Sequence, residues 1–545
     1  MPIKIEQILA DFEKASGRRS SWDDLWQQVV DLIMPTREFN RTRTGGERRR
    51  VDIYDETGPN ACLTLASGLH GLLTNPGLQW LTFAVEDDGT RINEDEQVRT
   101  WLDTIRNMIL GRFASPEFGF NTQAHEVYMD LAGFGTAAMI LAPTTTNSFG
   151  MRFQSRPLSE MYIAEDEMDR PRTMFRKFKL SHQQAWDKWG KLAPKDTVEI
   201  FTDPNSKGNK FEERDYLHAV GPRLDFYPDR RDRRNKPFFS IHIEMKEKEM
   251  VGEESGFDEM PYMFSRFEKA SGEVYGRGPG IHMLNTVRTA NAMKKTILMA
   301  GEKAVAPPLL VMATGVDGPI HTGPNAITWT RQGLQPAQTV QALNSGNRMD
   351  IGVELLALEQ QTIKQGFFND VIGPLPIVDR ATTVEINARM QQRMQIMSPI
   401  LSRLEEEFLD QVVTKVYNHM VRTGQFPMPP DILQDRTLEI KYVSPLALSQ
   451  RASEAVNINQ WAQFIAPYSQ GDPTVLDVID TAEIGRYGGY LFNVPQRVMR
   501  TRQEVMQIRE QREEVEQAQA QAQIAEQTAS AAHQGAQALT EVANA

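Results

Sequence analysis

Two helical patterns on either side of a small insert constrain the fold of this chain more than any other feature. Apolar residues recur at helical spacing over 281–303, ahead of Pro307 and Pro308, and again over 350–367. The insert between them, 307–346, is rich in Gly, Pro and Thr. Helices of roughly 20 residues reach about 30 Å, so this order predicts a helical hairpin that holds a small module at its end.

The composition of the two helical patterns indicates self-association. Gln, Lys, Arg and Glu are too frequent for a membrane span, and the apolar stripes are too narrow for both helices to be buried within one chain. We therefore expect a ring or bundle of identical subunits rather than a monomeric enzyme. We expect no insertion into a membrane.

The chain before the hairpin, 1–277, has the mixed pattern of an α+β domain. Helices are predicted over 5–33 (broken at Ser16 and Gly17, with Ser20 or Ser21 as a cap), 61–73, 94–113, 120–134 and 181–189, the last capped by Ser181. Strands are predicted over 80–85, 137–141, 196–203 and 238–251, with further short strands between 151 and 176 and a polar loop over 203–236.

The chain after the hairpin begins with a Gly- and Pro-containing loop, 369–380, and a long helical pattern over 382–421. Pro399 lies inside this pattern, which predicts a kink or break near Ser398. A strand is predicted over 438–442 and helices over 447–465, 473–479 and 482–490. The last helix becomes a Gln/Ala/Glu repeat from about residue 511 and is either a self-associating helix or a frayed end.

Length, charge and cysteine content limit the possible functions. The chain has 545 residues, enough for three or four domains, and a formal net charge of −12. This charge disfavours tight general binding to nucleic acid, although an acidic protein can border DNA while like charge keeps the DNA mobile. The single cysteine, Cys62, permits no intrachain disulfide and is predicted to be a small buried apolar residue. The N-terminus has no apolar leader, so we expect assembly in the cytoplasm.

The sequence contains no recognisable catalytic or cofactor motif. The run from Gly276 to Gly280 has the wrong spacing for a phosphate loop, and the nine histidines have no metal-ligand spacing. Two acidic clusters, 165–169 and 253–259, are interpreted as solvated loops rather than metal sites, and 405–407 as a polar helix face. The basic runs 41–50 and 230–236 either contact DNA or an acidic neighbour, or are solvated loops.

An ordered set of short motifs resembles a known family. It comprises Asp55–Gly58, Ala66–Thr74 with Pro76 and Trp80, Pro261–Met263 with Arg266, Tyr275–Gly280, Leu284–Met299, and Pro307 with Pro308. Together these resemble the head-to-tail connector, or portal, proteins of short-tailed, T7-like bacteriophages. The resemblance covers most of the chain to about Pro495 and leaves out the Gln/Ala tail.

The resemblance implies an α+β multidomain subunit of a ring, usually of twelve copies. The implied parts are an α+β wing (1–277), stem helices (278–306 and 347–368), a small α/β clip (307–346), a channel loop (369–381), a long wing helix (382–424), a return strand of the wing (425–446), a helical crown (447–500) and a C-terminal helix or barrel (501–545).

The resemblance also implies a function without catalysis or cofactors. The ring stands at one capsid vertex of the virion, assembled in the host cytoplasm, and DNA passes through it during packaging and ejection. Implied partners are other copies of the chain, double-stranded DNA, the terminase motor, the major capsid and scaffolding proteins, and tail adaptor or tail tube proteins.

Site residues are predicted from their place in this implied layout. They are Asn369, Asp370, Asp379 and Arg380 in the channel loop, Lys364 on the channel-lining stem, and Thr314, Asp317, His321 and Trp329 in the clip that meets motor and tail. Arg380 either touches DNA or caps the long helix. Two other functions stay open: a ring adaptor or scaffold without DNA in its lumen, and a metal-dependent nuclease formed from scattered acids.

Overall fold

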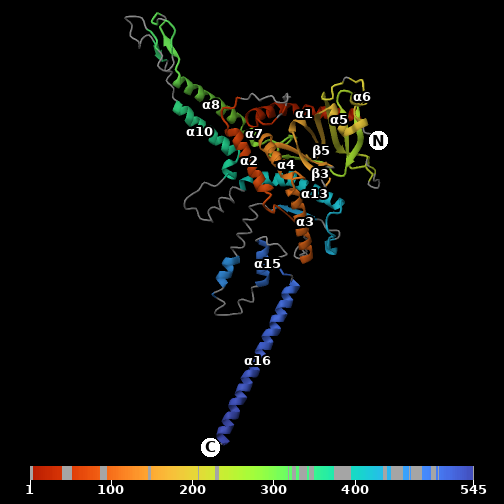
Figure 1. Cartoon of the computed structure of the whole chain (residues 1–545), viewed down its shortest axis with the longest axis vertical. Coiled ribbons are helices and arrows are strands. Elements are labelled where there is room, and N and C mark those ends of the chain that lie inside the picture. Colours follow the sequence, from red (N-terminus) through yellow and green to blue (C-terminus); the bar gives the residue numbers. More distant parts are fainter. Residues whose placement is uncertain are drawn as a thin grey trace. The chain divides into compact units, whose positions relative to one another are not determined.

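The structure is a computed structural model in which helices and sheets are mixed (Figure 1). It describes residues 4–543 except 38, 40–51, 86–94, 145–148, 207, 228–231, 233, 313, 317, 322–326, 330–339, 343–348, 374–394, 434–437, 443–457, 466, 468–480, 492–498 and 501. The chain divides into two compact units. The first unit is Met1–Leu81 with Asn107–Phe426, and the second is Thr82–Arg106 with Pro427–Ala545. The predicted α+β, multidomain class is confirmed.

Two antiparallel sheets make up most of the β structure described in the first unit. The smaller sheet has the order β3-β2-β9, with bounds Met151–Arg156, Thr136–Pro143 and Tyr262–Arg266. The larger has the order β4-β5-β6-β7-β8, with bounds Met161–Glu165, Pro171–Ser181, Glu213–Pro222, Phe238–Glu244 and Met250–Phe257.

Helices surround these sheets and extend from them as a hairpin. They are α1 Ile5–Leu32, α2 Thr57–Leu73, α4 Phe120–Phe134, α5 His182–Trp189, α6 Lys195–Thr202, α7 Pro279–His282, α8 Leu284–Val305, α10 Met349–Gly366, α11 Asn369–Ile372 and α13 Asp410–Arg422, with short turns η2 Leu158–Glu160 and η3 Gly190–Leu192. Figure 1 shows α8 and α10 side by side, with the strands β10 Leu309–Val311 and β11 Val340–Ala342 beyond their ends.

The helix α1 is continuous, so the predicted break at Ser16 and Gly17 and the cap at Ser20 or Ser21 are wrong. Burial of Arg19 explains the continuity of α1. Its guanidinium donates to Met161 O at 2.8 Å and to Ser159 O, in η2, at 2.9 Å. One glycine costs a helix only about 1 kcal/mol, which such tertiary contacts outweigh.

One face of α1 completes a core against the larger sheet. Its apolar members are Ile8, Phe12 and Ala15 on α1 with Phe175, Leu217, Ala219, Ile241 and Ile243 on the strands. The strand members alternate with residues of the opposite face, as the two-residue period of a strand requires. The buried thiol of Cys62 on α2 confirms its predicted role as a small apolar residue.

Two strand predictions on the sheet are corrected. Residues 196–203 are not a strand, because Lys195–Thr202 is the helix α6, whose buried Thr197 hydroxyl pairs with His182 Nδ1 at 2.8 Å. The predicted polar loop 203–236 contains the ten-residue strand β6 at its centre. Residues 238–251 are two strands rather than one, because the chain turns between β7 and β8 at Lys248, where φ is 56°. The predicted helix over 181–189 with its Ser181 cap is confirmed as α5, and Gln184 completes a capping box.

The long helix does not break at the predicted position near Ser398. Residues 395–404 are helical through Pro399, and the irregularity comes later, as a π-helical turn, η4, at Glu405–Leu409. A π-turn shifts all later side chains around the helix axis and is frequent at functional sites. Here it precedes α13, which buries Val412, Val416 and Met420.

The second unit contains one small sheet and several helices. Strand β1, Leu81–Val85, pairs with β12, Leu438–Tyr442; both strands were predicted, but their pairing was not. Its helical elements are α3 Glu96–Ala114 (which ends in the first unit), η5 Asp431–Leu433, a helical stretch over 458–465, α15 Thr481–Leu491 and α16 Arg502–Ala543. The predicted helix 473–479 and residues 447–457 of the predicted helix 447–465 lie outside the described residues.

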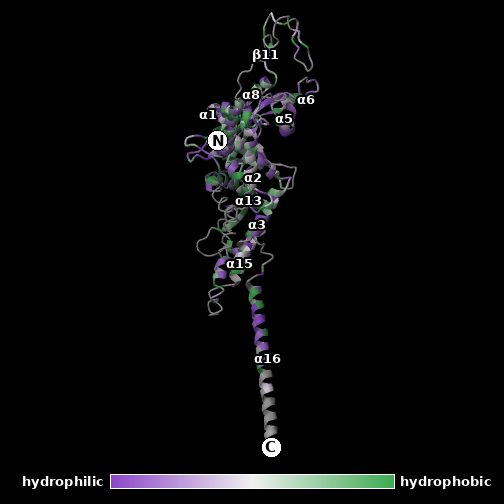
Figure 2. Ribbon diagram, turned by 90° about the vertical axis from the view of Figure 1, so that its left-hand side faces the viewer, coloured by the Kyte–Doolittle hydropathy of each residue, from purple (hydrophilic) through white to green (hydrophobic). Residues whose placement is uncertain are grey.

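The C-terminal α16 is a single helix of 42 residues. Met506, Val515 and Ile524 are exposed apolar residues of this helix. In Figure 2 the first part of α16 is mostly hydrophilic, with a few hydrophobic residues between. None of the described helices is long and apolar enough to cross a membrane.

Candidate functional site

A crossing of two backbone segments joins the smaller sheet to the first hairpin helix. The Gly276 N–H donates to Thr136 Oγ1 at 2.8 Å, and the Thr136 hydroxyl donates to Gly276 O at 3.2 Å. A Cβ atom at Gly278 would lie 2.5 Å from a main-chain oxygen of α4, and one at Gly280 would lie 2.4 Å from Gly133 O. The Gly-rich motif is therefore a place where main chain packs on main chain, not a phosphate loop.

The segment before α2 ties the two hairpin helices together at their root. Asn291 on α8 accepts through Oδ1 from the backbone N–H groups of Tyr54 and Asp55, at 2.7 and 3.1 Å. Gln360 on α10 donates to Asp55 Oδ1 at 2.7 Å. Asp55, just before α2, thus contacts α8 through its backbone N–H and α10 through its buried carboxylate, which gives the first of the motifs a structural role.

Two glycines of α2 allow close approach at the same root. A Cβ atom at Gly58 would lie 2.9 Å from Val287 Cγ1 on α8, and one at Gly68 would lie 1.7 Å from Ile372 Cγ2 on α11. Contacts under 3.0 Å are essentially never seen for real Cβ atoms, so a larger residue at either position would force the facing side chain or its helix to shift. The motifs that suggested the family thus meet where the hairpin leaves the sheet-rich body.

The structure describes two of the four residues predicted for the channel loop. Asn369 and Asp370 begin α11, whereas Asp379 and Arg380 lie outside the described residues. Asp370 is exposed. With its amide nitrogen turned toward the α2 backbone, Asn369 donates to Ala61 O at 3.1 Å, so this residue helps to hold α11 on α2.

Beyond its root, the hairpin buries little of its own surface. The buried residues of α8 are Leu284, Val287 and Ala290, all in its first two turns, and those of α10 are Leu356 and Ile363. Lys364, predicted to line a channel, follows Ile363 on α10 and is exposed. The distal half of α8 therefore has no buried side chain.

Large apolar side chains are exposed on both hairpin helices. They are Leu298, Met299 and Val305 on α8, and Met349, Ile351, Val353, Leu355 and Leu358 on α10. Val305 is 89% exposed and Leu358 is 57% exposed. A shallow apolar groove of about 510 Å³ runs along α8 from Arg288 to Ile297 and is closed on one side by Gly352 and Leu355 of α10. Exposed apolar area of this extent marks an interaction surface.

The tip of the hairpin presents a short two-stranded sheet. Strands β10 and β11 pair antiparallel, with Leu310 opposite Gln341. Of the predicted clip residues, Thr314, His321 and Trp329 are exposed, and Asp317 lies outside the described residues. The Trp329 ring, 72% exposed, is the largest apolar group at the tip.

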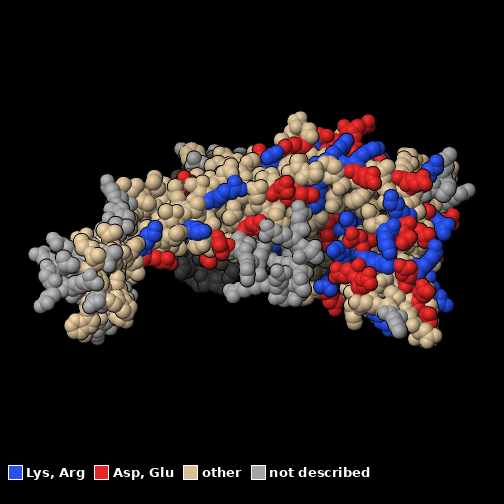
Figure 3. Space-filling model, turned by 90° about the horizontal axis from the view of Figure 1, so that it is seen from above, with Lys and Arg blue, Asp and Glu red and all other residues tan. Residues whose placement is uncertain are grey.

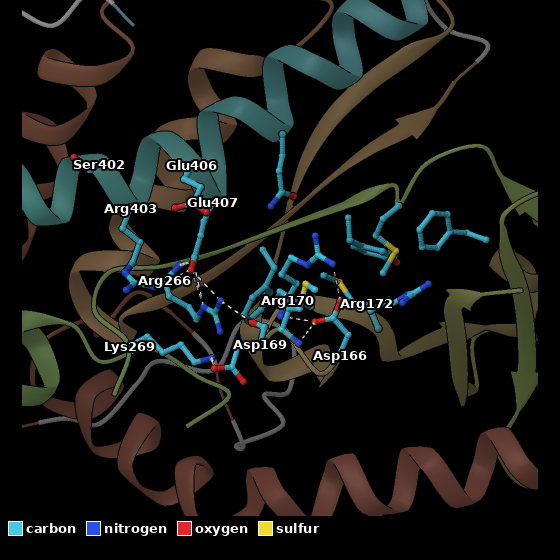
Figure 4. A pocket seen from close by; sticks show the side chains of 18 of the residues that line it. Asp166, Asp169, Arg170, Arg172, Arg266, Lys269, Ser402, Arg403, Glu406 and Glu407 are labelled. Carbon is cyan, nitrogen blue, oxygen red and sulfur yellow. Dashed lines mark hydrogen bonds and ion pairs between the residues drawn. The ribbon is translucent and has the colours of Figure 1, made fainter. Parts of the chain in front are cut away.

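A charged cavity of about 870 Å³ lies between β5, β9 and the helix that includes Arg403 (Figure 4). Arg266 on β9 is its buried centre, with Nη2 at 2.9 Å from Glu407 Oε1 and a second ion pair to Glu165. Lys269 Nζ lies 3.1 Å from Glu165, and Arg403 Nη1 lies 3.0 Å from Glu407. Burial alone would lower the pKa of Arg266, but the bonds to Glu407 and Glu165 raise it.

Glu407, in the π-helical turn, does not lie on a solvated polar face as predicted, because its side chain is 14% exposed and pairs with the buried Arg266. Its carboxylate also accepts from the backbone N–H of Arg266 at 2.9 Å, which fastens the turn to β9. The partners are 141 residues apart, and no sequence period joins them. The only signal was the presence of Arg266 in a family motif.

The acidic clusters are paired with cations instead of facing a common point. Glu165 pairs with Arg266 and Lys269, and Glu259 lies 3.4 Å from Arg422. Among the residues that the structure describes, no group of three His, Cys, Asp or Glu could hold a metal ion.

Comparison with known proteins identifies the family. The model of the bacteriophage head to tail connecting protein family matches residues 6–499. The probable portal protein of Bordetella phage BPP-1 is 26% identical over 491 residues, 87% of this chain and 84% of that protein. The portal protein of Salmonella phage epsilon15 is 26% identical over 491 residues, which cover 87% of this chain and 85% of that protein.

The chain therefore belongs to the bacteriophage head to tail connecting protein family, whose members are structural proteins and not enzymes. The match ends before α16, as the resemblance predicted for the Gln/Ala tail.

Proposed function

We propose that this chain is the portal subunit of a tailed phage and forms a ring, with twelve copies expected, at one capsid vertex. The observation that carries the proposal is the hairpin, whose two helices expose apolar side chains that the chain itself leaves uncovered. Identical neighbours around an axis would cover these side chains on every subunit. Family membership over 6–499 supports the same role.

The proposal also divides the chain into the parts of such a ring. We assign 278–306 and 347–368 to the stem, 307–346 to the clip, 1–277 with 382–424 and the strand in 425–446 to the wing, 369–381 to the channel loop, 447–500 to the crown and 501–545 to a C-terminal helix or barrel. The close packing at Gly278 and Asp55 supports a stem that is rigidly joined to the wing.

Electrostatic repulsion is the proposed means of keeping DNA mobile in the ring. DNA carries about one negative charge per 1.7 Å of axis, and each subunit carries a formal charge of −12. Asp370 and Asp379 on the channel loop would repel the phosphates, while Lys364 and Arg380 would make brief contacts with them. Arg380→Ala variants should package or retain less DNA, and unchanged packaging and retention would remove this contact.

The proposed partners are those of a connector. During packaging the clip would meet the terminase motor through Thr314, Asp317, His321 and Trp329, and later the same face would meet tail adaptor or tail tube proteins. The wing would meet the major capsid and scaffolding proteins, with assembly in the host cytoplasm.

Electron microscopy of the purified full chain tests the proposal. A closed ring with an axial hole is expected, and capsids with gold-labelled subunits should carry the label at one vertex. A chain that stays monomeric at high concentration would contradict the proposal. A ring whose lumen variants all package DNA normally would instead support an adaptor without DNA in its lumen.

A further inference from the structure

Cations and aromatic rings gather on the face of the larger sheet that α5 covers. The Arg176 guanidinium lies 4.4 Å from the centre of the Phe178 ring, and Lys188 Nζ lies 5.4 Å from the same ring. Lys188 Nζ is also 4.6 Å from the Trp189 ring. Lys188 is exposed as a residue, and its Nζ lies near both rings.

Two stacked histidines continue this cluster. His218 and His242 are opposite each other on β6 and β7, with ring centres 4.3 Å apart and planes at 6°. His218 pairs with Tyr262 OH and Ser240 Oγ, both at 2.9 Å, and His242 Nε2 lies 3.2 Å from Lys188 Nζ. An ammonium group can only donate, so His242 Nε2 is the acceptor and the ring is neutral.

Arg156 on β3 adds a third strong cation. Its Nη2 donates to Gln154, while its Nε is buried with no hydrogen-bond partner among the described residues. Burial first, and then the nearby Arg176, lower the pKa of Arg156. Burial, Arg176 and Arg156 also lower the pKa of Lys188 to about 8.

The described part of the cluster contains too little negative charge for these cations. Glu160 is the carboxylate that pairs with it, with Oε2 at 2.7 Å from Arg176 Nε. Lys188 and Arg156 have no ion pair within the described ranges. The Arg266 cavity is the contrast, because each of its buried cations has a carboxylate within about 3 Å.

We propose that Arg156, Arg176 and Lys188 bind an anionic oxygen group of the phosphate or carboxylate type. Charge-assisted hydrogen bonds from guanidinium and ammonium groups recognise such oxygens. The anion would supply the missing counter-charge, and the unpaired Arg156 Nε offers it a donor. The bound anion is either a free ion or a carboxylate from a second copy of the chain. Only the carboxylate of a second copy rests on the proposed self-association.

Thermal unfolding of the full chain tests the site. Inorganic phosphate should raise the Tm of the wild type by roughly 2 °C or more over chloride at equal ionic strength and neutral pH. The variant Arg156→Gln/Lys188→Gln should lose this increment, and in chloride its Tm should equal or exceed that of the wild type because like charges are removed. Lys195→Gln, at an exposed lysine paired with Glu249, is the matched control and should keep the increment.

The single variant Lys188→Gln, at an exposed position, repeats the test if the double variant folds poorly. If phosphate raised the Tm of wild type and variant equally, the rise would be a general salt effect. That result would contradict binding of a free anion at this site. Sedimentation separates the second source. If the anion is a carboxylate of another copy, the variant should assemble at least tenfold more weakly and phosphate should compete with assembly. No specific phosphate effect together with unchanged assembly would overturn the proposal.

Discussion

The sheet-rich body and the helical hairpin of the first unit differ in how far the chain itself covers their apolar and charged side chains. On the body, apolar residues such as Phe12 and Leu217 are buried within the chain, and Arg266 is paired with Glu407. On the hairpin, Val305 and Leu358 are exposed. Charged residues crowd the surface of the body and are sparse along the hairpin arm (Figure 3). The body completes its own core, whereas the hairpin depends on something outside the chain.

The free energy of burying apolar surface favours covering the hairpin from outside the chain. Apolar area removed from water stabilises by about 25 cal/mol per Å², so the hairpin gains most when neighbours cover it. The difference predicts that substitutions in the body act on folding of the subunit, whereas those on the hairpin act on assembly.

The border between the two regions should show the largest effect. Gly278→Ala should destabilise the subunit by about 4 kcal/mol or more, because the new Cβ meets backbone that cannot move away alone. The control Gly301→Ala, on α8 with nothing within 4 Å of the new Cβ, should stabilise by up to about 1 kcal/mol. Chemical denaturation followed by circular dichroism measures both. Equal effects would show that the crossing does not fix the hairpin.

In the body, Glu407→Gln should cost about 3 kcal/mol, since it leaves the buried Arg266 short of one carboxylate. Glu406→Gln, at an exposed position in the same π-turn, should change stability by less than about 0.5 kcal/mol. Urea unfolding midpoints give the comparison. If both variants match the wild type, the body does not rely on internal pairing.

On the hairpin, Val353→Glu with Leu358→Glu should weaken assembly by about 100-fold, or about 2.8 kcal/mol, and leave subunit folding intact. Glu354→Gln, on an exposed turn of the same helix, serves as the control. Sedimentation velocity reports assembly and circular dichroism reports folding. Loss of folding, or normal assembly, would break the distinction between the two regions.

The smallest effect is a pH dependence confined to the body. Burial, then Lys188 and Arg176, lower the pKa of His242 to about 3, below the ordinary 6.5. Between pH 6.5 and 3, His242 is therefore protonated in the unfolded chain but neutral in the folded chain. Its contribution to the free energy of unfolding is fully present above pH 6.5 and is lost as the pH falls toward 3. The loss should be about 1 kcal/mol by a pH of about 5.5, after allowance for solvent screening.

His242→Gln should flatten this pH profile of the unfolding midpoint. His321→Gln, at the exposed hairpin tip, should leave the profile unchanged. A wild-type midpoint that is constant down to a pH of about 5 would show that the stacked histidines do not titrate as their burial requires.

Sequence patterns correctly predicted those helices whose bounds are set by residues near one another in the chain. The helix Phe120–Phe134 matches its predicted bounds, and the hairpin helices were found within a few residues, because their apolar periods and terminating prolines are local. Likewise, Ser181 acts through a residue three positions away.

Features set by distant partners could not be predicted. The continuity of α1 depends on Arg19 and oxygens about 140 residues away, and the π-turn depends on Arg266. Site residues fared similarly. Exposure of Lys364 and Trp329 follows from their place on a hairpin, but the contact of Asn369 with α2 required the folded chain.

Main chain packed on main chain at Gly278 leaves no side chain at that corner for mutation to reshape. The outer surfaces of body and arm can therefore diverge freely while the angle between them is inherited unchanged. Descendants of such a subunit could change both outer surfaces and still keep the same corner. Glycines that touch nothing but peptide groups would then be the most durable record of ancestry in the chain.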